Sequence, residues 1–178
     1  RGGDTARFDT LMLKIIASST AGTRPAELAY EELTEALELA RKLNAPFEVY
    51  LHSYFHQAAF DRGDFEMAEK HLQDYVRGAD SIPQGIRSVV WLDAAFFYAF
   101  ARKDLHLANS YWDQFQPSAI IPKAQLLATE AALAWLNKEK EIARHKTLSA
   151  ISELPGMMDK GVSLALKTKL LQLKERGD

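Results

Sequence analysis

The sequence predicts an all-α protein of about nine helices that pair as antiparallel hairpins. The first observation behind this prediction is the stretch Val89–Ala101, in which Asp93 is the only residue that is not apolar. A run of this length without glycine, proline or alternation exceeds an ordinary strand, and a helix that is apolar on every side is normally buried on every side. The second observation is that no segment alternates as a strand would. The third is a turn signature that recurs three times in the middle of the chain.

Length and composition fit one globular domain over residues 1–178. Of the 178 residues, 47% are hydrophobic and 26% are charged, which is ordinary for a folded domain with a sizeable core. The net charge of -2 gives no reason to expect nucleic acid or an anionic membrane surface as a partner. Because the chain has no cysteine, disulfides, thiol catalysis and cysteine-bound zinc are excluded.

The start of the chain is polar and does not resemble a signal peptide. The longest apolar run is shorter than the roughly 20 residues that cross a membrane. We therefore expect a cytoplasmic protein, or a domain on the cytosolic face of a membrane protein that does not itself insert. Since the chain begins without Met, we expect a fragment of a longer protein.

Residues 1–43 are expected to form an N-terminal helix pair. The first helix covers Asp4–Ser18 and ends before Gly22. The second runs from Thr23 to Leu43, with Pro25 in its first turn, where the missing N–H of proline is harmless.

Residues 44–154 are expected to form three hairpins. Asn44 can cap the third helix, which ends at Gly63, and Asp64 can cap the fourth. The next four helices are expected over residues 89–101, 105–115, 123–136 and 139–154. In the last of these, the residues expected to face inward are Ile142, Ala143, Leu148 and Ile151.

A ninth helix is expected over residues 158–174, after the break at Pro155. Its apolar face consists of Val162, Leu166, Leu170 and Leu173. Repeat arrays need a terminal element with one apolar and one polar face, so we expect residues 155–178 to cap the array. The alternative is that this helix folds back and fills an aromatic groove.

A short signature marks the turn inside each of the three hairpins. It consists of a turn residue, an acidic residue that can cap the next helix and an alanine five residues after the turn. The small alanine allows the two helices of a hairpin to approach closely. The three copies are Gly63-Asp64-Phe65-Glu66-Met67-Ala68, Lys103-Asp104-Leu105-His106-Leu107-Ala108 and Lys138-Glu139-Lys140-Glu141-Ile142-Ala143.

The spacing and the residues of this signature resemble the tetratricopeptide repeat. The alanines lie 40 and 35 residues apart, near the roughly 34-residue period of that family. The match is clear in the first copy, which also has Leu72, and degenerate in the other two, where lysine replaces the turn glycine. The resemblance covers about 110 residues and implies a right-handed superhelix in which the first helix of each hairpin lines a concave groove.

The groove implied by this resemblance has an apolar and aromatic floor. Its residues by the family pattern are Tyr50, Ser53, Gln57, Phe60, Val90, Asp93, Phe97, Phe100, Gln125, Ala128, Ala132 and Trp135. The floor lacks the Lys/Asn/Arg set with which chaperone-binding relatives hold a C-terminal carboxylate, so that ligand class is not expected.

Two histidines, His52 and His56, are four residues apart and therefore share a helix face. Zinc peptidases use this spacing with a glutamate directly after the first histidine, but here that residue is Ser53. A third metal ligand could come from His71 or from a carboxylate. The favoured interpretation is that these are packing or surface histidines, with no metal and no cofactor.

Asp93 interrupts the most apolar stretch of the chain. Either it is a functional charge in the groove, or its carboxylate is hydrogen-bonded to a neighbouring tyrosine or to the next helix. In both cases a partner is expected, because an unpaired buried carboxylate is costly.

No glycine-rich phosphate loop, nucleophile elbow or basic aromatic patch is present. The sequence therefore predicts no catalytic residues and a protein that is not an enzyme.

Four short stretches also resemble the cytosolic C-terminal region of bacterial site-2-protease-like membrane metallopeptidases. The matching stretches occur in the same order along roughly the first 110 residues, and they are Arg1-Gly2-Gly3, Gly22-Thr23-Arg24-Pro25, Asp61-Arg62-Gly63-Asp64 and Ala94-Ala95-Phe96-Phe97. The family often has aromatic and acidic residues after the Arg-Pro pair, where this chain has Ala26-Glu27-Leu28. The resemblance implies a regulatory module whose catalytic HExxH would lie outside this chain, so no catalytic residue carries over.

These observations lead to two functional hypotheses of different class. The first is a non-catalytic helical-repeat module that binds a protein or peptide segment in the groove, without nucleic acid and without inserting into a membrane. The alternative is a small-molecule or lipid sensor with an enclosed aromatic pocket formed by Trp91, Phe97, Phe100 and Trp135. The oligomeric state and the identity of the partner are left open.

Overall fold

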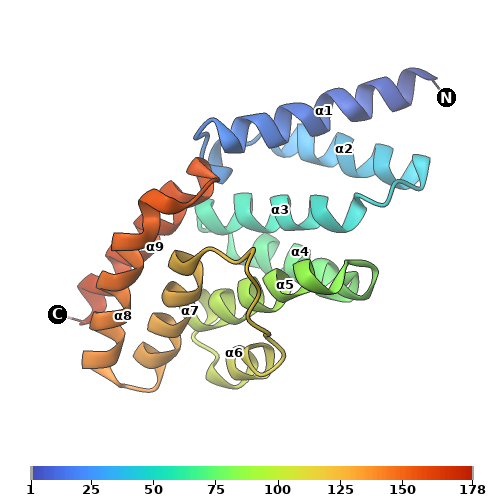
Figure 1. The fold of residues 1–178 in the computed structure, drawn as a ribbon. Coiled ribbons are helices and arrows are strands. Elements are labelled where there is room, and N and C mark those ends of the chain that lie inside the picture. Colours follow the sequence, from blue (N-terminus) through green and yellow to red (C-terminus); the bar gives the residue numbers. More distant parts are fainter. Residues whose placement is uncertain (1, 178) are drawn as a thin grey trace. The chain divides into compact units, whose positions relative to one another are not determined.

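A computed structural model describes residues 2–177, and within that range the chain forms nine α-helices and no strand (Figure 1). The prediction of an all-α protein is confirmed. The helices are α1 Gly2–Thr20, α2 Tyr30–Leu43, α3 Glu48–Arg62, α4 Phe65–Arg77, α5 Gln84–Phe97, α6 Leu105–Trp112, α7 Lys123–Leu136, α8 Lys140–Glu153 and α9 Lys160–Gly177. The shorter elements are the 3₁₀ turns η1 Pro25–Glu27, η2 Ala79–Ser81 and η4 Leu154–Gly156, and the π-helix η3 Tyr98–Arg102.

The helices group into two compact units. The first contains the chain up to Gly78 together with Asp159–Val162, and the second contains Ala79–Met158 together with α9 from Ser163 onward. The expectation of one domain over residues 1–178 stays a prediction.

The short segment Asp159–Val162 belongs to the first unit because it packs against the end of α1. The hydroxyl of Ser19 donates a hydrogen bond of 2.7 Å to the carboxylate of Asp159. Gly161 lies so close to Thr23 that a Cβ atom there would be 2.0 Å from the Thr23 carbonyl oxygen. Only glycine fits this approach.

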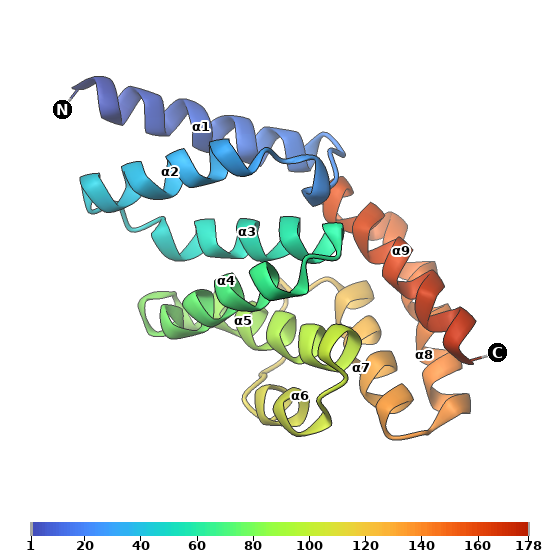
Figure 2. The same cartoon turned by 180° about the vertical axis from the view of Figure 1, so that it is seen from behind.

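Three hairpins are formed by adjacent helices, namely α3 with α4, α5 with α6, and α7 with α8. The last of these pairs is seen side by side in Figures 1 and 2. The turn residue of each predicted signature has a left-handed backbone, with φ of 81° at Gly63, 54° at Lys103 and 63° at Lys138. The signature thus marks the same turn conformation three times, even where lysine replaces glycine.

The acidic residue of the signature caps the next helix in two hairpins of the three. The Asp64 carboxylate accepts a hydrogen bond from the Met67 backbone N–H at 3.1 Å, and the Asp104 carboxylate accepts one from the Leu107 N–H at 2.9 Å. Glu139 makes no such bond, so the expectation of a cap there is wrong. Glutamate has a longer side chain than aspartate and is not one of the residue types preferred at the N-cap.

The predicted close approach of the paired helices is confirmed by the burial of the signature alanines. Ala68 and Ala108 are 0% exposed and Ala143 is 6% exposed. A larger side chain at these positions would push the helices of each hairpin apart.

The inward face of α8 differs from the expected one. Ile142 is 51% exposed and Leu148 is 45% exposed, so their assignment to the core is wrong. The buried face of α8 consists instead of Ala143, Thr147 and Ala150. Small side chains occupy this face because α7 packs closely against it, and their small size hides them from a search for large apolar residues.

The third helix also begins later than expected. Asn44 does not cap it at the N-terminus, because Asn44 has φ of 51° and ends α2, while α3 begins at Glu48. Asparagine is one of the few residues that adopts the left-handed conformation readily, and it often ends helices for this reason.

The central apolar stretch forms α5 and the π-helix η3, as a buried helical segment. Val90 and Phe97 are 0% exposed, and Phe100 is 3% exposed. Trp91 is only partly buried, and its ring stacks on that of Tyr111 with the centroids 6.2 Å apart. The prediction of a buried central helix is therefore confirmed, although one of its aromatic residues reaches the surface.

A buried ion pair joins the start of η1 to the end of α3 in the first unit. The Arg24 guanidinium donates to both carboxylate oxygens of Asp61, at 2.8 and 3.3 Å, and the Ala26 backbone N–H donates to the same carboxylate at 3.1 Å. The Asp61 side chain is 2% exposed. Its negative charge is thus compensated by a cation and a backbone donor, as burial requires.

Arg62, the neighbour of Asp61, holds the next part of the chain. Its guanidinium donates to the backbone carbonyls of Ala26 at 2.8 Å and Leu28 at 2.7 Å, and it lies 3.9 Å from the centre of the Tyr30 ring. Because Asp61 and Arg62 satisfy these backbone groups, the chain is not required to form helical hydrogen bonds there. This explains why the expected continuous helix from Thr23 is wrong and α2 begins only at Tyr30.

We predict that Phe97→Ala lowers the free energy of unfolding by about 3–5 kcal/mol, because it removes a fully buried ring and leaves a cavity. Ile142→Ala is the matched control in the same unit and should cost less than about 1 kcal/mol, because that side chain is half exposed. Urea denaturation of both variants measures the two values. Equal losses would contradict the burial described for α5 and α8.

We predict that Arg24→Ala lowers the free energy of unfolding by about 2–4 kcal/mol, because it leaves the buried Asp61 carboxylate without its cation. Arg7→Ala removes an exposed ion pair of the same bidentate geometry, to Glu35, and should cost less than about 1 kcal/mol. Thermal and urea denaturation of the two variants provide the comparison. A loss at Arg24 no larger than at Arg7 would show that the pair does not hold η1 in place.

Candidate functional site

A pocket of about 300 Å³ lies between α2, α3 and α4 in the first unit. Its wall combines aromatic and aliphatic side chains with several polar groups that can ionise. The lining residues are Tyr30, Thr34, Leu37, Arg41, His52, Phe55, Met67, Lys70, His71 and Asp74. A mostly apolar pocket with a few convergent polar groups is the usual form of a ligand site.

Three of these residues converge on one point of the pocket. His52 comes from α3, while His71 and Asp74 lie three residues apart and so share a face of α4. The Nδ1 atoms of the two histidines are 2.9 Å apart, and His52 Nδ1 is 3.7 Å from a carboxylate oxygen of Asp74. His52 is 5% exposed and His71 is 7% exposed, whereas the Asp74 side chain is 24% exposed.

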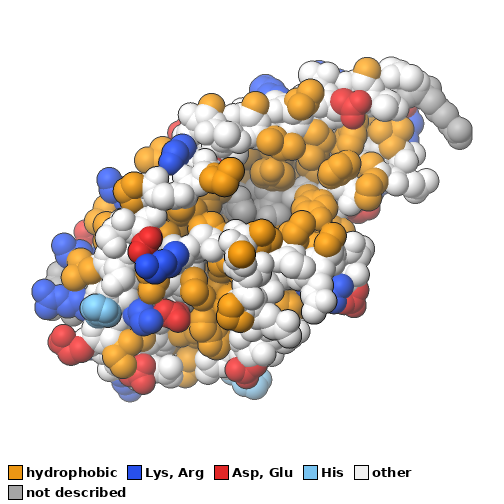
Figure 3. Space-filling view, viewed as in Figure 1, with side chains coloured by type: hydrophobic (Ala, Val, Ile, Leu, Met, Phe, Trp, Pro, Cys, Tyr) orange, Lys and Arg blue, Asp and Glu red, His pale blue; other side chains and the backbone are white. Residues whose placement is uncertain are grey.

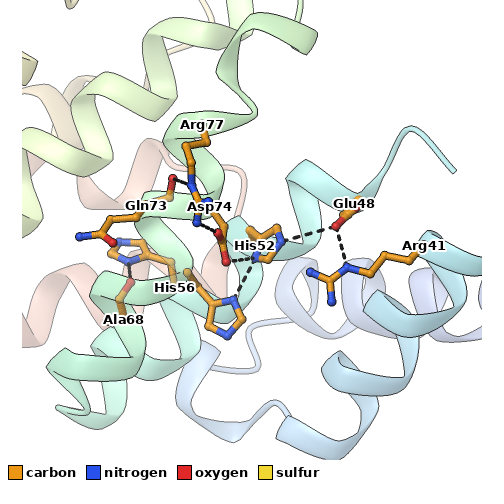
Figure 4. A network of polar contacts seen from close by, with 9 residues as sticks. Arg41, Glu48, His52, His56, Ala68, Gln73, Asp74 and Arg77 are labelled. Carbon is orange, nitrogen blue, oxygen red and sulfur yellow. Dashed lines mark hydrogen bonds and ion pairs between the residues drawn. The ribbon is translucent and has the colours of Figure 1, made fainter. Parts of the chain in front are cut away.

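Charged residues surround this group on both sides (Figure 4). Arg77 pairs with the other carboxylate oxygen of Asp74. Glu48 lies 3.9 Å from the Nε2 atom of His52 and is itself bound by Arg41 at 2.7 Å. The pocket is therefore continuous with a network that alternates in charge.

Both buried histidines are held in the neutral form. Burial, together with the neighbouring His52, lowers the pKa of His71 to about 4. Burial also lowers the pKa of His52. The His71 ring stacks on Phe55, with the centroids 4.1 Å apart and the planes 7° apart. Two neutral imidazoles in fixed orientation offer nitrogen lone pairs at neutral pH.

The expected histidine pair is not the one that the structure brings together. His56 lies on α3 beside His52, but its Nδ1 atom contacts the Ala68 backbone carbonyl at 2.9 Å. The partner of His52 is His71, which the sequence suggested only as a third ligand. Asp74 was missed, although its three-residue spacing from His71 on an amphipathic helix could have indicated it.

The part of the predicted groove in the first unit lies on α3 and is partly accessible. Tyr50, Ser53 and Gln57 are half-buried, and Gln57 donates a long hydrogen bond of 3.4 Å to Ser53. Phe60 is 8% exposed and belongs to the core. Figure 3 shows hydrophobic side chains gathered on the surface over α1 to α3, and Phe47 is 48% exposed at the start of α3.

The part of the predicted groove in the second unit is mostly buried. The members with 8% exposure or less are Val90, Asp93, Phe97, Phe100, Ala128 and Ala132, whereas Gln125 and Trp135 are half-buried. Arg176 of α9 lies 4.7 Å from the Phe100 ring and 5.2 Å from the Trp135 ring, and it donates to the Phe100 carbonyl at 3.3 Å. The end of α9 thus contacts two predicted groove residues, while its role as a terminal cap stays a prediction.

Asp93 makes a contact with α7 that the sequence had left open. One carboxylate oxygen accepts a hydrogen bond of 2.5 Å from the Gln125 side chain, and the other has no hydrogen-bond partner among residues 2–177. Burial raises the pKa of Asp93 to about 7, against the opposing effect of Gln125. The expectation of a partner is confirmed for one oxygen, but the partner is neither a tyrosine nor the next helix, because Gln125 lies on α7, one helix further along the chain. With a pKa of about 7, the carboxyl titrates near neutral pH.

The stretches behind the metallopeptidase resemblance have structural roles in this fold. The ion pair between Arg24 and Asp61 joins the second stretch to the third. Ala94 and Ala95 of the fourth stretch are both 0% exposed in α5. Arg1, which begins the first stretch, lies outside the described residues.

In comparisons with known proteins, no family model, no curated protein and no solved structure matches the chain. By its structure the protein belongs to the all-α class, with hairpin contacts between adjacent helices. Among residues 2–177, no helix is both long and apolar enough to cross a membrane.

We predict that Asp93→Asn gains stability relative to the wild type as the pH rises from about 5 to 8. Asp93 has a higher pKa in the folded protein than in the unfolded chain, so its contribution is fully present below the unfolded pKa and is lost as the pH rises through about 7. Asparagine keeps the acceptor for Gln125 without the charge, and the relative gain should be about 2–3 kcal/mol.

Urea denaturation of both proteins across this pH range measures the difference. His52 and His71 are present in both proteins, so their contribution to the pH dependence of the free energy of unfolding cancels when the two proteins are compared. A constant difference between the variant and the wild type would show that Asp93 does not titrate in this range.

Proposed function

We propose that the chain is a non-catalytic helical-hairpin module that binds a protein segment along α3. The observation that carries this proposal is the row of partly exposed side chains Tyr50, Ser53 and Gln57 on one face of that helix. The row combines an aromatic ring with a hydroxyl and an amide, which is a typical composition of adaptable binding surfaces. The 3.4 Å hydrogen bond between Gln57 and Ser53 is long, so a partner's backbone can replace it at little cost.

The repeated turn supports a tetratricopeptide-like array as the finer description of the fold. Gly63, Lys103 and Lys138 share a left-handed turn, and a small buried alanine follows each turn. In such arrays the first helix of each hairpin faces the ligand. The accessible row lies on the first helix of the first hairpin, α3, which agrees with that arrangement.

An association with a membrane-embedded zinc metallopeptidase, on its cytosolic side, is the second part of the proposal. Its support is the ordered set of four short stretches, of which the second and the third are joined by the buried pair of Arg24 and Asp61. The second and third stretches are distant in sequence but meet in this ion pair, so they form one structural feature rather than two unrelated matches. The proposed role of the chain is then regulatory, with the catalytic residues outside it.

The alternative of a small-molecule pocket in the second unit has weaker support. Phe97 and Phe100 lie in the core, and Arg176 covers the rings of Phe100 and Trp135. A ligand at that place would have to displace the guanidinium and its hydrogen bond to the backbone. We therefore retain the peptide-binding hypothesis.

We predict that peptides selected on the chain from a library of apolar and aromatic sequences bind to the α3 row. Tyr50→Ala and Gln57→Ala should each weaken binding by about tenfold, because each removes a contact of roughly 1–2 kcal/mol. Fluorescence anisotropy with the labelled peptide measures the affinities, and Lys140→Ala on the exposed face of α8 is the control.

Two results would overturn the proposal. One is a selected peptide whose affinity is the same for the wild type and both α3 variants. The other is a hydrolytic or transfer activity of the isolated chain, since the proposal assigns no catalysis to it. Unchanged melting temperatures of the variants would exclude unfolding as the cause of a loss.

A further inference from the structure

We propose that His52, His71 and Asp74 form a binding site for a divalent transition-metal ion, with Zn²⁺ as the ion that this donor set suits best. The three donor atoms come from two helices of one hairpin and lie within 4.8 Å of one another. Two imidazoles and one carboxylate are a common ligand set for zinc. This site is independent of the proposed peptide-binding row.

Two of the three donor–donor distances are close to those of a tetrahedral site, and the third lies within 4.8 Å. With zinc–ligand bonds of about 2.0–2.1 Å, two ligand atoms in a tetrahedron are about 3.3 Å apart. The His52–His71 nitrogen distance of 2.9 Å and the His52–Asp74 distance of 3.7 Å lie on either side of this value. Each of these two distances differs from the tetrahedral value by about 0.4 Å, which is a change of the size that small side-chain adjustments produce.

The hydrogen positions also allow a metal to enter. In the contact between the two Nδ1 atoms, one neutral ring donates its N–H to the other. A metal between them needs both Nδ1 atoms without hydrogen, so each ring must carry its remaining proton on Nε2. The Nε2 atom of His52 faces Glu48 at 3.9 Å, and Glu48 is held by Arg41. A carboxylate beside the second N–H of a metal-bound histidine is the usual outer-shell arrangement, and Glu48 would have to approach His52 by about 1 Å to accept this N–H as a hydrogen bond.

Asp74 is oriented in a similar way. Arg77 binds one carboxylate oxygen and leaves the other directed toward His52. Stacking on Phe55 fixes the ring plane of His71. Each proposed ligand is therefore held by a neighbour, which lowers the entropy that metal binding would otherwise cost.

The charges that face the site are nearly balanced without an ion. Arg41 is paired with Glu48 and Arg77 with Asp74, while Lys70 is exposed on the wall of the pocket. A divalent cation is thus opposed mainly by one lysine, whose charge is screened by water. The pocket of about 300 Å³ provides an entry path and room for a water molecule as the fourth ligand.

Zinc titration of the chelator-treated, tag-free chain tests the proposal by calorimetry at neutral pH. The expected result is one Zn²⁺ per chain, with a melting temperature that rises with zinc concentration. His71→Gln and Asp74→Asn should each weaken zinc binding by at least about tenfold, and Glu48→Gln by about tenfold through the outer shell. The control with His106→Gln and His145→Gln removes two exposed histidines of the second unit and should bind as the wild type does.

Asp74→Asn keeps the test decisive if His71→Gln fails to fold, because Asp74 is partly exposed and asparagine has the same shape. Co²⁺ as a second probe should give the strong visible absorption of a tetrahedral site, and Asp74→Asn should reduce it. The proposal is overturned if the wild type shows no stoichiometric binding. It is equally overturned if Asp74→Asn binds zinc as tightly as the wild type, or if only the control with both exposed histidines replaced loses binding.

Discussion

The first unit depends on one buried negative charge, the carboxylate of Asp61. This group has to be compensated, and it is compensated by the Arg24 guanidinium and the Ala26 backbone N–H, both from the segment that follows α1. The ion pair therefore connects two parts of the chain that are 37 residues apart in sequence. Because removal of one partner leaves a buried charge, the contact tolerates little displacement. It sets where η1 ends and where α2 can begin, and α2 supplies one wall of the pocket.

The hairpins follow from a second constraint, the need to end one helix and start the next within a few residues. A left-handed residue achieves this, and the N–H groups that follow it return to carbonyls of the last helical turn, as from Asp64 to Ala59 and from Glu139 to Ala134, both at 2.9 Å. Lysine at this place is less favourable than glycine. The hydrogen bonds of the turn and the packing of Ala143 against α7 hold Lys138 in this conformation.

Each unit contains a buried polar contact between side chains of two different helices. In the first unit His52 meets His71, and in the second Asp93 meets Gln125. His52, His71 and Asp93 are all buried, so each of these polar groups depends on a partner from a different helix. Such contacts fix which residues of the two helices face each other more strictly than apolar packing does. At these contacts a proton, or the metal ion proposed for His52 and His71, would change the local charge. They are therefore the chemically distinctive points of this fold.

The sequence by itself determined the helical class, the position of the hairpin turns and the burial of the central helix. These depend on local patterns: apolar periodicity, turn residues and the small alanine after each turn. The tertiary structure alone decided that His71 rather than His56 meets His52, and that Gln125 is the partner of Asp93. It also decided that α8 turns Ile142 outward and that the chain at Ala26 is not an α-helix. The polar contacts depend on a group distant in the chain that pairs with a buried donor, acceptor or charge, and the exposure of Ile142 depends on which face of α8 packs against α7. A local sequence pattern does not identify the distant partner in either case.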